Sequence, residues 1–163
     1  MAVLTAVALI VFIIEAQVPL PIPVPGAKLG LANTVTLFAL FFKRGKEDGT
    51  VSLSATDAFM ILLCRIILGS MFSGRFIAFV YSTVGGLFGF AAQAVLKRFV
   101  TRKQIWACGA VGAVFHNAGQ ILAAILVTGS PAIVAYLPIL IIAGVIAGSI
   151  TGLVAQITLT RIR

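Results

Sequence analysis

Six apolar segments separated by short polar stretches take up almost the whole sequence, at residues 2–17, 29–42, 55–72, 76–96, 105–128 and 132–159. A helix needs about 20 apolar residues to cross a bilayer, and about 17–25 are tolerated. Hydrophobic residues make up 61% of the chain and charged residues only 10%, so one soluble core of this size could not hide the apolar surface. The pattern predicts an all-α integral membrane protein, with residues 1–163 forming a single domain that is a bundle of six transmembrane helices.

The basic residues between these segments indicate how the bundle is oriented. Nine of them fall in the second loop, the fourth loop or the C-terminal tail: Lys43, Arg44, Lys46, Lys97, Arg98, Arg102, Lys103, Arg161 and Arg163. Only Lys28 and Arg75 fall in the loops predicted on the other side. Cytoplasmic loops carry the excess of Lys and Arg, so the sequence predicts a cell-membrane protein with both termini in the cytoplasm. The net charge of +8 is then explained by topology, and no nucleic-acid partner is expected.

Several polar residues lie where apolar ones are expected, and ionisable groups within a bilayer usually serve a function. By the predicted topology all of them lie at mid-depth or toward the outer face. We therefore predict an outward-facing cavity for a small molecule, in which basic groups favour an anion and an acidic group balances one of them. The candidate substrate-binding residues are Glu15, Lys28, Asn33, Arg65, His116, Asn117 and Gln120.

Structural roles for some of these residues remain open. Glu15 could only pair with Lys28 at the membrane interface, where long side chains reach water at low cost. Asn117, Gln120 and His116 could only form hydrogen bonds between helices. Arg65 is the hardest to explain in this way, because an arginine in mid-membrane without a partner or water is expensive.

The first loop is rich in proline over residues 19–25, which excludes a regular helix there because proline lacks an N–H group and fixes φ. Glycines follow at Gly26 and Gly30, near the start of the second segment. Such a start leaves backbone N–H groups available to an anion. A plain interfacial linker accounts for the same residues equally well.

Small residues recur at four-residue intervals in the last segment, at Gly144, Gly148 and Gly152, and in the fourth at Gly85 and Gly89. Such stripes let helix backbones approach closely in lipid. Packing within the bundle is favoured over a dimer interface, because every span has to pack somewhere.

The common catalytic signatures are missing from the sequence. It has no Walker A motif, no aspartate cluster for magnesium diphosphate and no Ser/His/Asp or metal-ligand constellation. Cys64 and Cys108 form no CxxC pattern and are predicted to be small packing residues. We expect no cofactor, no metal and no catalysis by this chain alone.

Three stretches resemble a known family: PVPGAKLGLANTVTLFAL at 23–40, RIILGSMFSGRF at 65–76 and GAVFHNAGQILAA at 112–124. The family is the membrane proteins called heptaprenyl diphosphate synthase component I, or Gx transporter family. It is similar in architecture to the S components of energy-coupling factor transporters. That resemblance implies an S-component-like fold with a small-molecule site near the outer face, capped by the first loop. It also implies docking onto a T component and two ATPases, and Ala2 and Ala6 match the Ala-x-x-x-Ala docking pattern.

The resemblance leaves two functions open. The first is a substrate-binding transport subunit for a small anionic or isoprenoid-related molecule, energised by partner subunits. The second is a non-catalytic membrane subunit of a heptaprenyl diphosphate synthase in the menaquinone or isoprenoid pathway, with the basic second and fourth loops recruiting a soluble prenyl synthase. The missing acidic motifs favour the transport role. A scaffold without any ligand is a third alternative.

Overall fold

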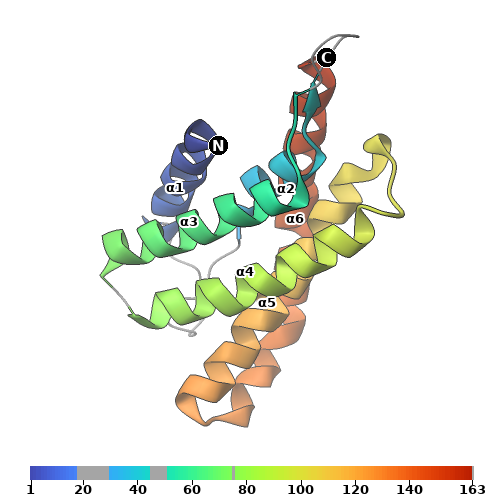
Figure 1. Ribbon diagram of the computed structural model, residues 1–163. Helices are drawn as coiled ribbons and strands as arrows, with labels where there is room; N and C mark the ends of the chain where they lie inside the picture. The colour runs from blue at the N-terminus through green and yellow to red at the C-terminus, as the bar shows by residue number, and fades with distance from the viewer. Residues whose placement is uncertain (18–29, 45–50, 75, 163) are drawn as a thin grey trace.

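The computed structural model describes residues 1–17, 30–44, 51–74 and 76–162, and they are mainly helical (Figure 1). Strands β1 (Lys43–Arg44) and β2 (Val51–Ser52) form a short antiparallel ladder. The 3-10 helices are η1 (Arg102–Gln104) and η2 (Pro131–Tyr136). The α-helices are α1 (Ala2–Gln17), α2 (Asn33–Phe41), α3 (Ala55–Ser73), α4 (Phe76–Leu96), α5 (Ile105–Thr128) and α6 (Leu137–Arg161).

The predicted helix boundaries agree with the structure for α1, α3, α4 and α5 to within one residue. Two segments differ. The segment predicted at 29–42 is helical only over Asn33–Phe41, because Gly30 has a φ of +79°, outside helical geometry. Residues 131–136 form a 3-10 helix, and α6 begins only at Leu137. Pro138 explains the later start of α6. In a helix that began at residue 132, its ring would lie in the interior and remove a backbone hydrogen bond, whereas proline is well tolerated in the first turn.

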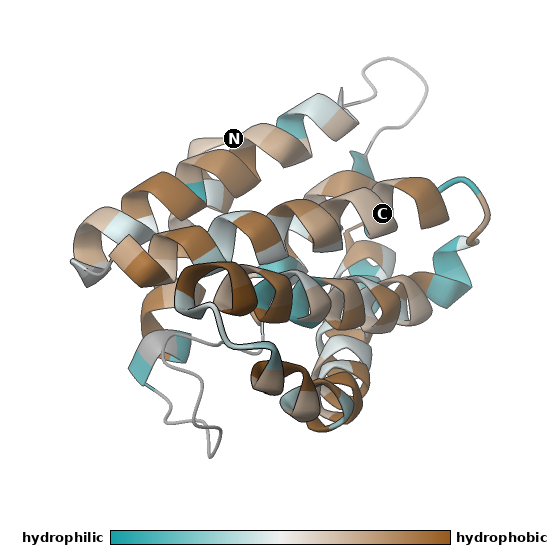
Figure 2. Cartoon of the chain, turned by 90° about the horizontal axis from the view of Figure 1, so that it is seen from below, coloured by the Kyte–Doolittle hydropathy of each residue, from teal (hydrophilic) through white to brown (hydrophobic). Residues whose placement is uncertain are grey.

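Four helical segments of the described chain are long and apolar enough to cross a membrane: Ala55–Phe72, Phe76–Leu96, Arg102–Thr128 and Pro131–Arg161. A fifth apolar helix, Ala2–Glu15, is shorter. Large apolar side chains cover the outside of the bundle; Met71 is 74% exposed and Leu126 is 73% exposed. Figure 2 shows this hydrophobic character along most of the helices. The chain is therefore a membrane protein, while the count of six spans stays a prediction.

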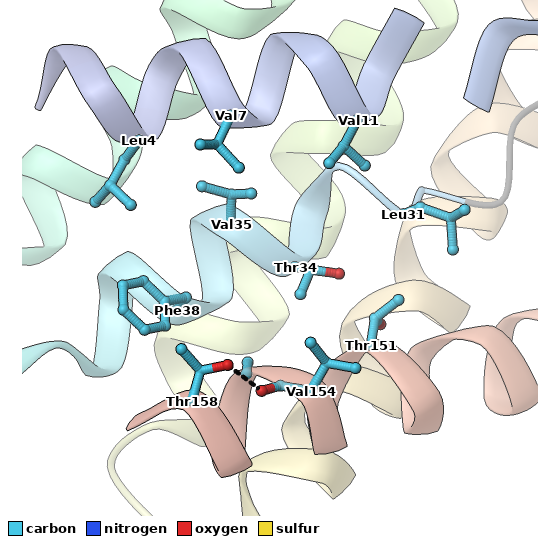
Figure 3. A pocket seen from close by; sticks show the side chains of 11 residues that line it. Leu4, Val7, Val11, Leu31, Thr34, Val35, Phe38, Thr151, Val154 and Thr158 are labelled. Atoms are coloured by element: carbon cyan, nitrogen blue, oxygen red, sulfur yellow. Dashed lines mark hydrogen bonds between the residues drawn. The ribbon is translucent and has the colours of Figure 1, made fainter. Parts of the chain in front are cut away.

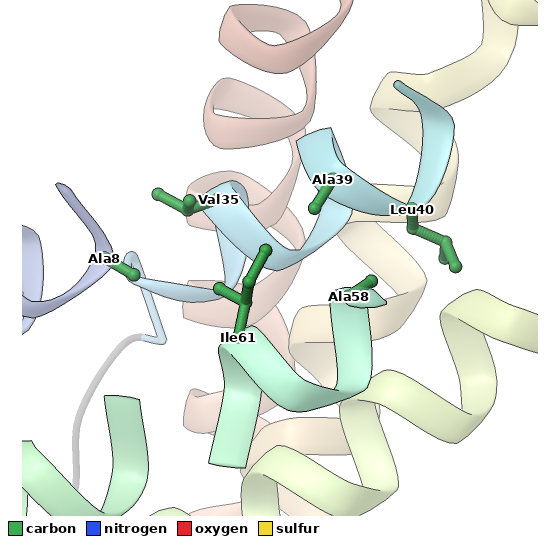
Figure 4. Close-up of a cluster of buried hydrophobic side chains, with 6 residues drawn as sticks. All are labelled: Ala8, Val35, Ala39, Leu40, Ala58 and Ile61. Atoms are coloured by element: carbon green, nitrogen blue, oxygen red, sulfur yellow. The ribbon is translucent and has the colours of Figure 1, made fainter. Parts of the chain in front are cut away.

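The helix α2 has nine residues and is enclosed by other helices, since six of the nine are buried. Figure 4 shows one of the clusters that hold it. Val35, Ala39 and Leu40 of α2 pack there against Ala8 of α1 and against Ile61 and Ala58 of α3. The position of α2 inside the bundle gives its first residue access to several helices at once.

The helices α4, α5 and α6 pack through glycines at very short distances. A Cβ atom added to Gly148 of α6 would lie 2.5 Å from the carbonyl oxygen of Gly109 in α5. A Cβ atom added to Gly119 of α5 would lie 3.0 Å from Gly85 Cα in α4. These contacts confirm that the small-residue stripes serve packing within the bundle.

The described basic segments meet at one end of the molecule. A buried cluster that includes Leu37, Ile105 and Leu159 joins the second half of α2, the start of α5 and the end of α6. Leu96, the last residue of α4, and Val100, four residues later, pack against the same cluster. The segments that carry Lys43, Lys97, Lys103 and Arg161 therefore lie toward one end, as the predicted topology requires, and Figure 1 shows the end of α6 near the β1–β2 ladder. Which side of the membrane this end faces stays a prediction.

The two cysteines differ in environment. Cys108 is buried and its Sγ lies 3.6 Å from the carbonyl oxygen of Gln93, which agrees with the predicted packing role. Cys64 is exposed on α3, so the prediction that it is a packing residue is wrong. The apolar character of its segment reflects contact with lipid, which sequence hydropathy does not distinguish from a protein core.

Candidate functional site

Six of the seven predicted site residues are buried in the interior of the bundle, although they come from four helices. Lys28 lies outside the described residues. The buried ones are Glu15 on α1, Asn33 on α2, Arg65 on α3, and His116, Asn117 and Gln120 on α5. All but Asn117 belong to one connected polar cluster.

Asn33, the first residue of α2, connects two other members of this cluster, Arg65 and His116. Its Oδ1 accepts a hydrogen bond of 2.9 Å from an Nη atom of Arg65. Its Nδ2 lies 3.0 Å from Nδ1 of His116. One amide side chain thus joins α2 to both α3 and α5.

The contacts of Asn33 determine which nitrogen of His116 carries a proton. A guanidinium can only donate, so Asn33 must present its oxygen to Arg65 and its amino group to His116. His116 Nδ1 is then the acceptor, and Nε2 bears the hydrogen. Nε2 of Gln120 lies 3.0 Å from Nε2 of His116. Since two N–H groups cannot bond to each other, we assign the Gln120 amide in the reversed orientation, with its oxygen accepting from the imidazole.

Glu15 bonds to the backbone where α2 begins. Its carboxylate accepts hydrogen bonds from the N–H groups of Gly30, at 2.5 Å, and Ala32, at 3.4 Å. Ala32 is the N-cap of α2 and supplies no side-chain cap of its own. Glu15 therefore caps α2 from another helix. Its predicted pairing with Lys28 involves a residue outside the described part of the chain.

Arg65 is only 2% exposed, and the described residues satisfy only part of its hydrogen-bonding capacity. Its guanidinium lies 5.9 Å from the ring centroid of Phe12 on α1, within range of a cation–π contact. Glu15 is close enough to act on it electrostatically. Its Nε atom is buried and has no acceptor among the described residues. A buried cationic donor without an acceptor is costly, and a ligand oxygen could satisfy it.

Two glycines of α4 place backbone without side chains against the site, which the sequence analysis did not anticipate. A Cβ atom added to Gly85 would lie 2.9 Å from the carbonyl oxygen of His116 and 3.0 Å from its ring. A Cβ atom added to Gly86 would lie 3.7 Å from an Nη atom of Arg65. The adjacent glycines Gly85 and Gly86 inside an apolar segment were the sequence feature that could have indicated this close contact. The contribution of Phe12 had no signal, because one aromatic residue in an apolar helix looks like ordinary core.

Asn117 points to a different helix. Its Nδ2 donates a 2.7 Å hydrogen bond to the carbonyl oxygen of Leu140 on α6. Its Oδ1 is buried without a partner in the part of the chain described here. Asn117 therefore forms a hydrogen bond between helices, as the alternative interpretation expected, and its part in substrate binding stays a prediction.

An apolar groove of about 440 Å³ lies between α1, α2 and α6 (Figure 3). It contacts the face of α2 that carries Val35 and Phe38, and Leu31 just before the helix, whereas the three-to-four-residue period places Asn33 away from that face. The polar cluster and the groove are thus separate features on two sides of one short helix.

The remaining predictions concern docking and metals. Ala2 and Ala6 lie exposed on α1, where a partner helix could reach them. Within the described ranges no group of three or more His, Cys, Asp or Glu residues could hold a metal ion.

Sequence comparison assigns the chain to a family. The family model described as heptaprenyl diphosphate synthase component I matches residues 4–158, which include every buried member of the polar cluster. Comparisons with curated proteins and with solved structures found no match. Because the family model covers nearly the whole chain, the chain belongs to the heptaprenyl diphosphate synthase component I family.

Proposed function

We propose that the chain is the substrate-binding membrane subunit of a transporter, similar to the S components of energy-coupling factor transporters. It would hold a small anionic or isoprenoid-related molecule at the buried polar cluster. The observation that carries the proposal is Arg65, which is 2% exposed and whose Nε has no acceptor among the described residues.

Energetics support a ligand-binding role for the cluster. Placing an arginine at the centre of a transmembrane helix costs about 2.5–3.5 kcal/mol on insertion scales. A purely structural network would be expected to satisfy each of its donors, since each buried unsatisfied group costs about 1–3 kcal/mol. The buried Nε of Arg65 is thus a donor that an anionic oxygen of a ligand would satisfy.

Partner subunits would supply the energy for transport. The sequence contains no Walker A motif, so ATP hydrolysis would come from separate ATPases. A transmembrane T component would dock on α1, where Ala2 and Ala6 are exposed and would allow close approach of another helix.

The printed description of the family supports a second candidate, a non-catalytic membrane subunit of a heptaprenyl diphosphate synthase. In that case the basic end of the bundle, with exposed Lys97, Arg98 and Lys103, would recruit a soluble prenyl synthase. This candidate does not account for the unpaired donor of Arg65 inside the bundle.

Two measurements on the purified protein test these functions. Native mass spectrometry of the wild type should detect a retained small anionic or isoprenoid-related molecule, which Arg65→Gln loses and the exposed control Arg161→Gln keeps. Affinity purification from the native host should recover a T component and ATPases. Recovery of a soluble prenyl synthase, with no retained small molecule, would support the second candidate and contradict the first.

A further inference from the structure

The carboxylate of Glu15 occupies a position built for an anion. Two backbone N–H groups, of Gly30 and Ala32, converge on it from the same turn. Gly30 has a φ of +79°, a conformation that L side chains rarely adopt, and this helps its N–H to point toward the carboxylate. Backbone N–H groups that converge from one turn in this way form an anion-binding nest.

The nest coincides with the N-terminus of α2. Ala32 is the N-cap, and Asn33 begins the helix. The partial positive charge of a helix N-terminus favours an anion there. Ala32 has no side chain able to accept these hydrogen bonds, so the site depends on an acceptor from elsewhere in the protein or from a ligand.

Arg65 is a second, independent indication of a ligand at the same place. It bonds to Asn33, the first residue of α2, and Glu15 acts on it electrostatically. Its buried Nε has no acceptor in the described part of the chain. Glu15 therefore neutralises part of the charge but does not use all of the donors available to an anion here.

We propose that the start of α2 and Arg65 form an anion site that Glu15 fills when no ligand is bound, and that a carboxylate or phosphate group of the ligand displaces Glu15. This inference rests on the proposed function as a binding subunit and specifies the substrate class. Glu15 is then an internal competitor of the ligand, where the sequence analysis made it a ligand contact. Displacing Glu15 would also release the last turn of α1 from the start of α2.

Removal of the competitor tests this inference. Glu15→Ala, Glu15→Gln and wild type are purified in detergent, and their thermal unfolding is measured in formate, in phosphate and in chloride of equal ionic strength. Formate tests a carboxylate site and phosphate tests a phosphate site. At saturation we expect at least one of the two to raise the melting temperature of Glu15→Ala by about 3 °C or more over chloride, because a ligand that binds only the folded state stabilises it. The melting temperature of the wild type should rise by less than a third of the increase seen for Glu15→Ala.

Matched variants make each outcome decisive. Glu15→Gln is isosteric and keeps the bundle filled, so it should also respond more strongly than wild type if Glu15→Ala cannot be purified. Glu15→Ala/Arg65→Gln should lose the response, whereas Glu15→Ala/Arg161→Gln should retain it. Equal responses of wild type and both single Glu15 variants, or no response in any of them, would overturn the anion site.

The failure of this inference is distinguishable from failure of the proposed function. If Glu15 variants show no anion response while the wild type still retains a small molecule and recovers ATPases, the binding subunit stands and the competitor role is wrong. If the anion response is present but only a prenyl synthase is recovered, the site stands and the transport role is wrong.

Discussion

Arg65 of α3 donates a 2.9 Å hydrogen bond to Oδ1 of Asn33, and this bond orients the Asn33 amide toward His116 of α5. Three helices are thereby coupled through two contacts among three side chains in the bundle interior. Since the guanidinium can only donate, a substitution of Arg65 should alter the tautomer of His116 as well as the local charge. The first two predictions test this relationship.

Replacing Arg65 should reduce both ligand retention and stability. Arg65→Gln removes the charge and should lower retention of the native small molecule at least about tenfold, which corresponds to roughly 1.4 kcal/mol of binding free energy. It should also destabilise the fold by about 1–3 kcal/mol if Asn33 Oδ1 loses its donor. Arg65→Lys should recover only part of both effects, because an ammonium group lacks the planar set of donors of arginine. Quantitative mass spectrometry and thermal unfolding measure the two effects. Equal retention by wild type and Arg65→Gln would contradict the site assignment.

His116 should be neutral and carry its proton on Nε2. It is the single histidine of the chain, so a spectrum of protein labelled with 15N-histidine contains one imidazole. The nitrogen shifts at pH 7 should report Nδ1 as the unprotonated acceptor. In Asn33→Leu, which removes the donor to Nδ1, the tautomer should become mixed. A dominant Nδ1–H form in the wild type would show that the Asn33 amide is oriented the other way.

The close packing of α5 on α6 should not tolerate a side chain at Gly148. A new Cβ atom there would lie 2.5 Å from Gly109 O and 2.7 Å from Ala110 Cα, and both are backbone atoms that cannot move independently. Gly148→Ala should therefore lower stability by roughly 1–3 kcal/mol through overpacking. Ile146→Ala is the control on the same helix, because Ile146 is 58% exposed on the outer surface. Thermal unfolding in one detergent compares the two, and a smaller loss for Gly148→Ala than for the control would contradict this packing.

Membrane orientation can be tested by cysteine labelling. In a Cys64→Ala/Cys108→Ala background, single cysteines are introduced as Phe99→Cys, between α4 and α5, and as Ser130→Cys, between α5 and α6. The excess of basic residues predicts that position 99 faces the cytoplasm and position 130 the outside. A membrane-impermeant thiol reagent should therefore label position 130 in intact cells, and position 99 only after permeabilisation. The reverse pattern would show that the predicted orientation is wrong.

The sequence alone was sufficient to predict the membrane environment and most helix boundaries. Apolar length and the near absence of charge within segments are local properties, so α1, α4 and α5 could be placed without a structure. The start of α6 was missed because Pro138 constrains the helix more strongly than the apolar run around it suggests. The start of α2 was missed because the positive φ of Gly30 delays the helix to Asn33. The buried polar residues could also be recognised individually, because each is unusual in its own segment.

The tertiary structure decided which of these residues act together. Helical periodicity gives the direction of a side chain on its own helix, but the rotation and depth of each helix against its neighbours depend on close packing at residues such as Gly85 and Gly148. That packing brings Asn33 to Arg65 and His116 and turns Asn117 away toward α6. The sequence thus determined that this is a helical membrane protein with polar groups inside it, whereas only the helix packing determined which of those groups meet.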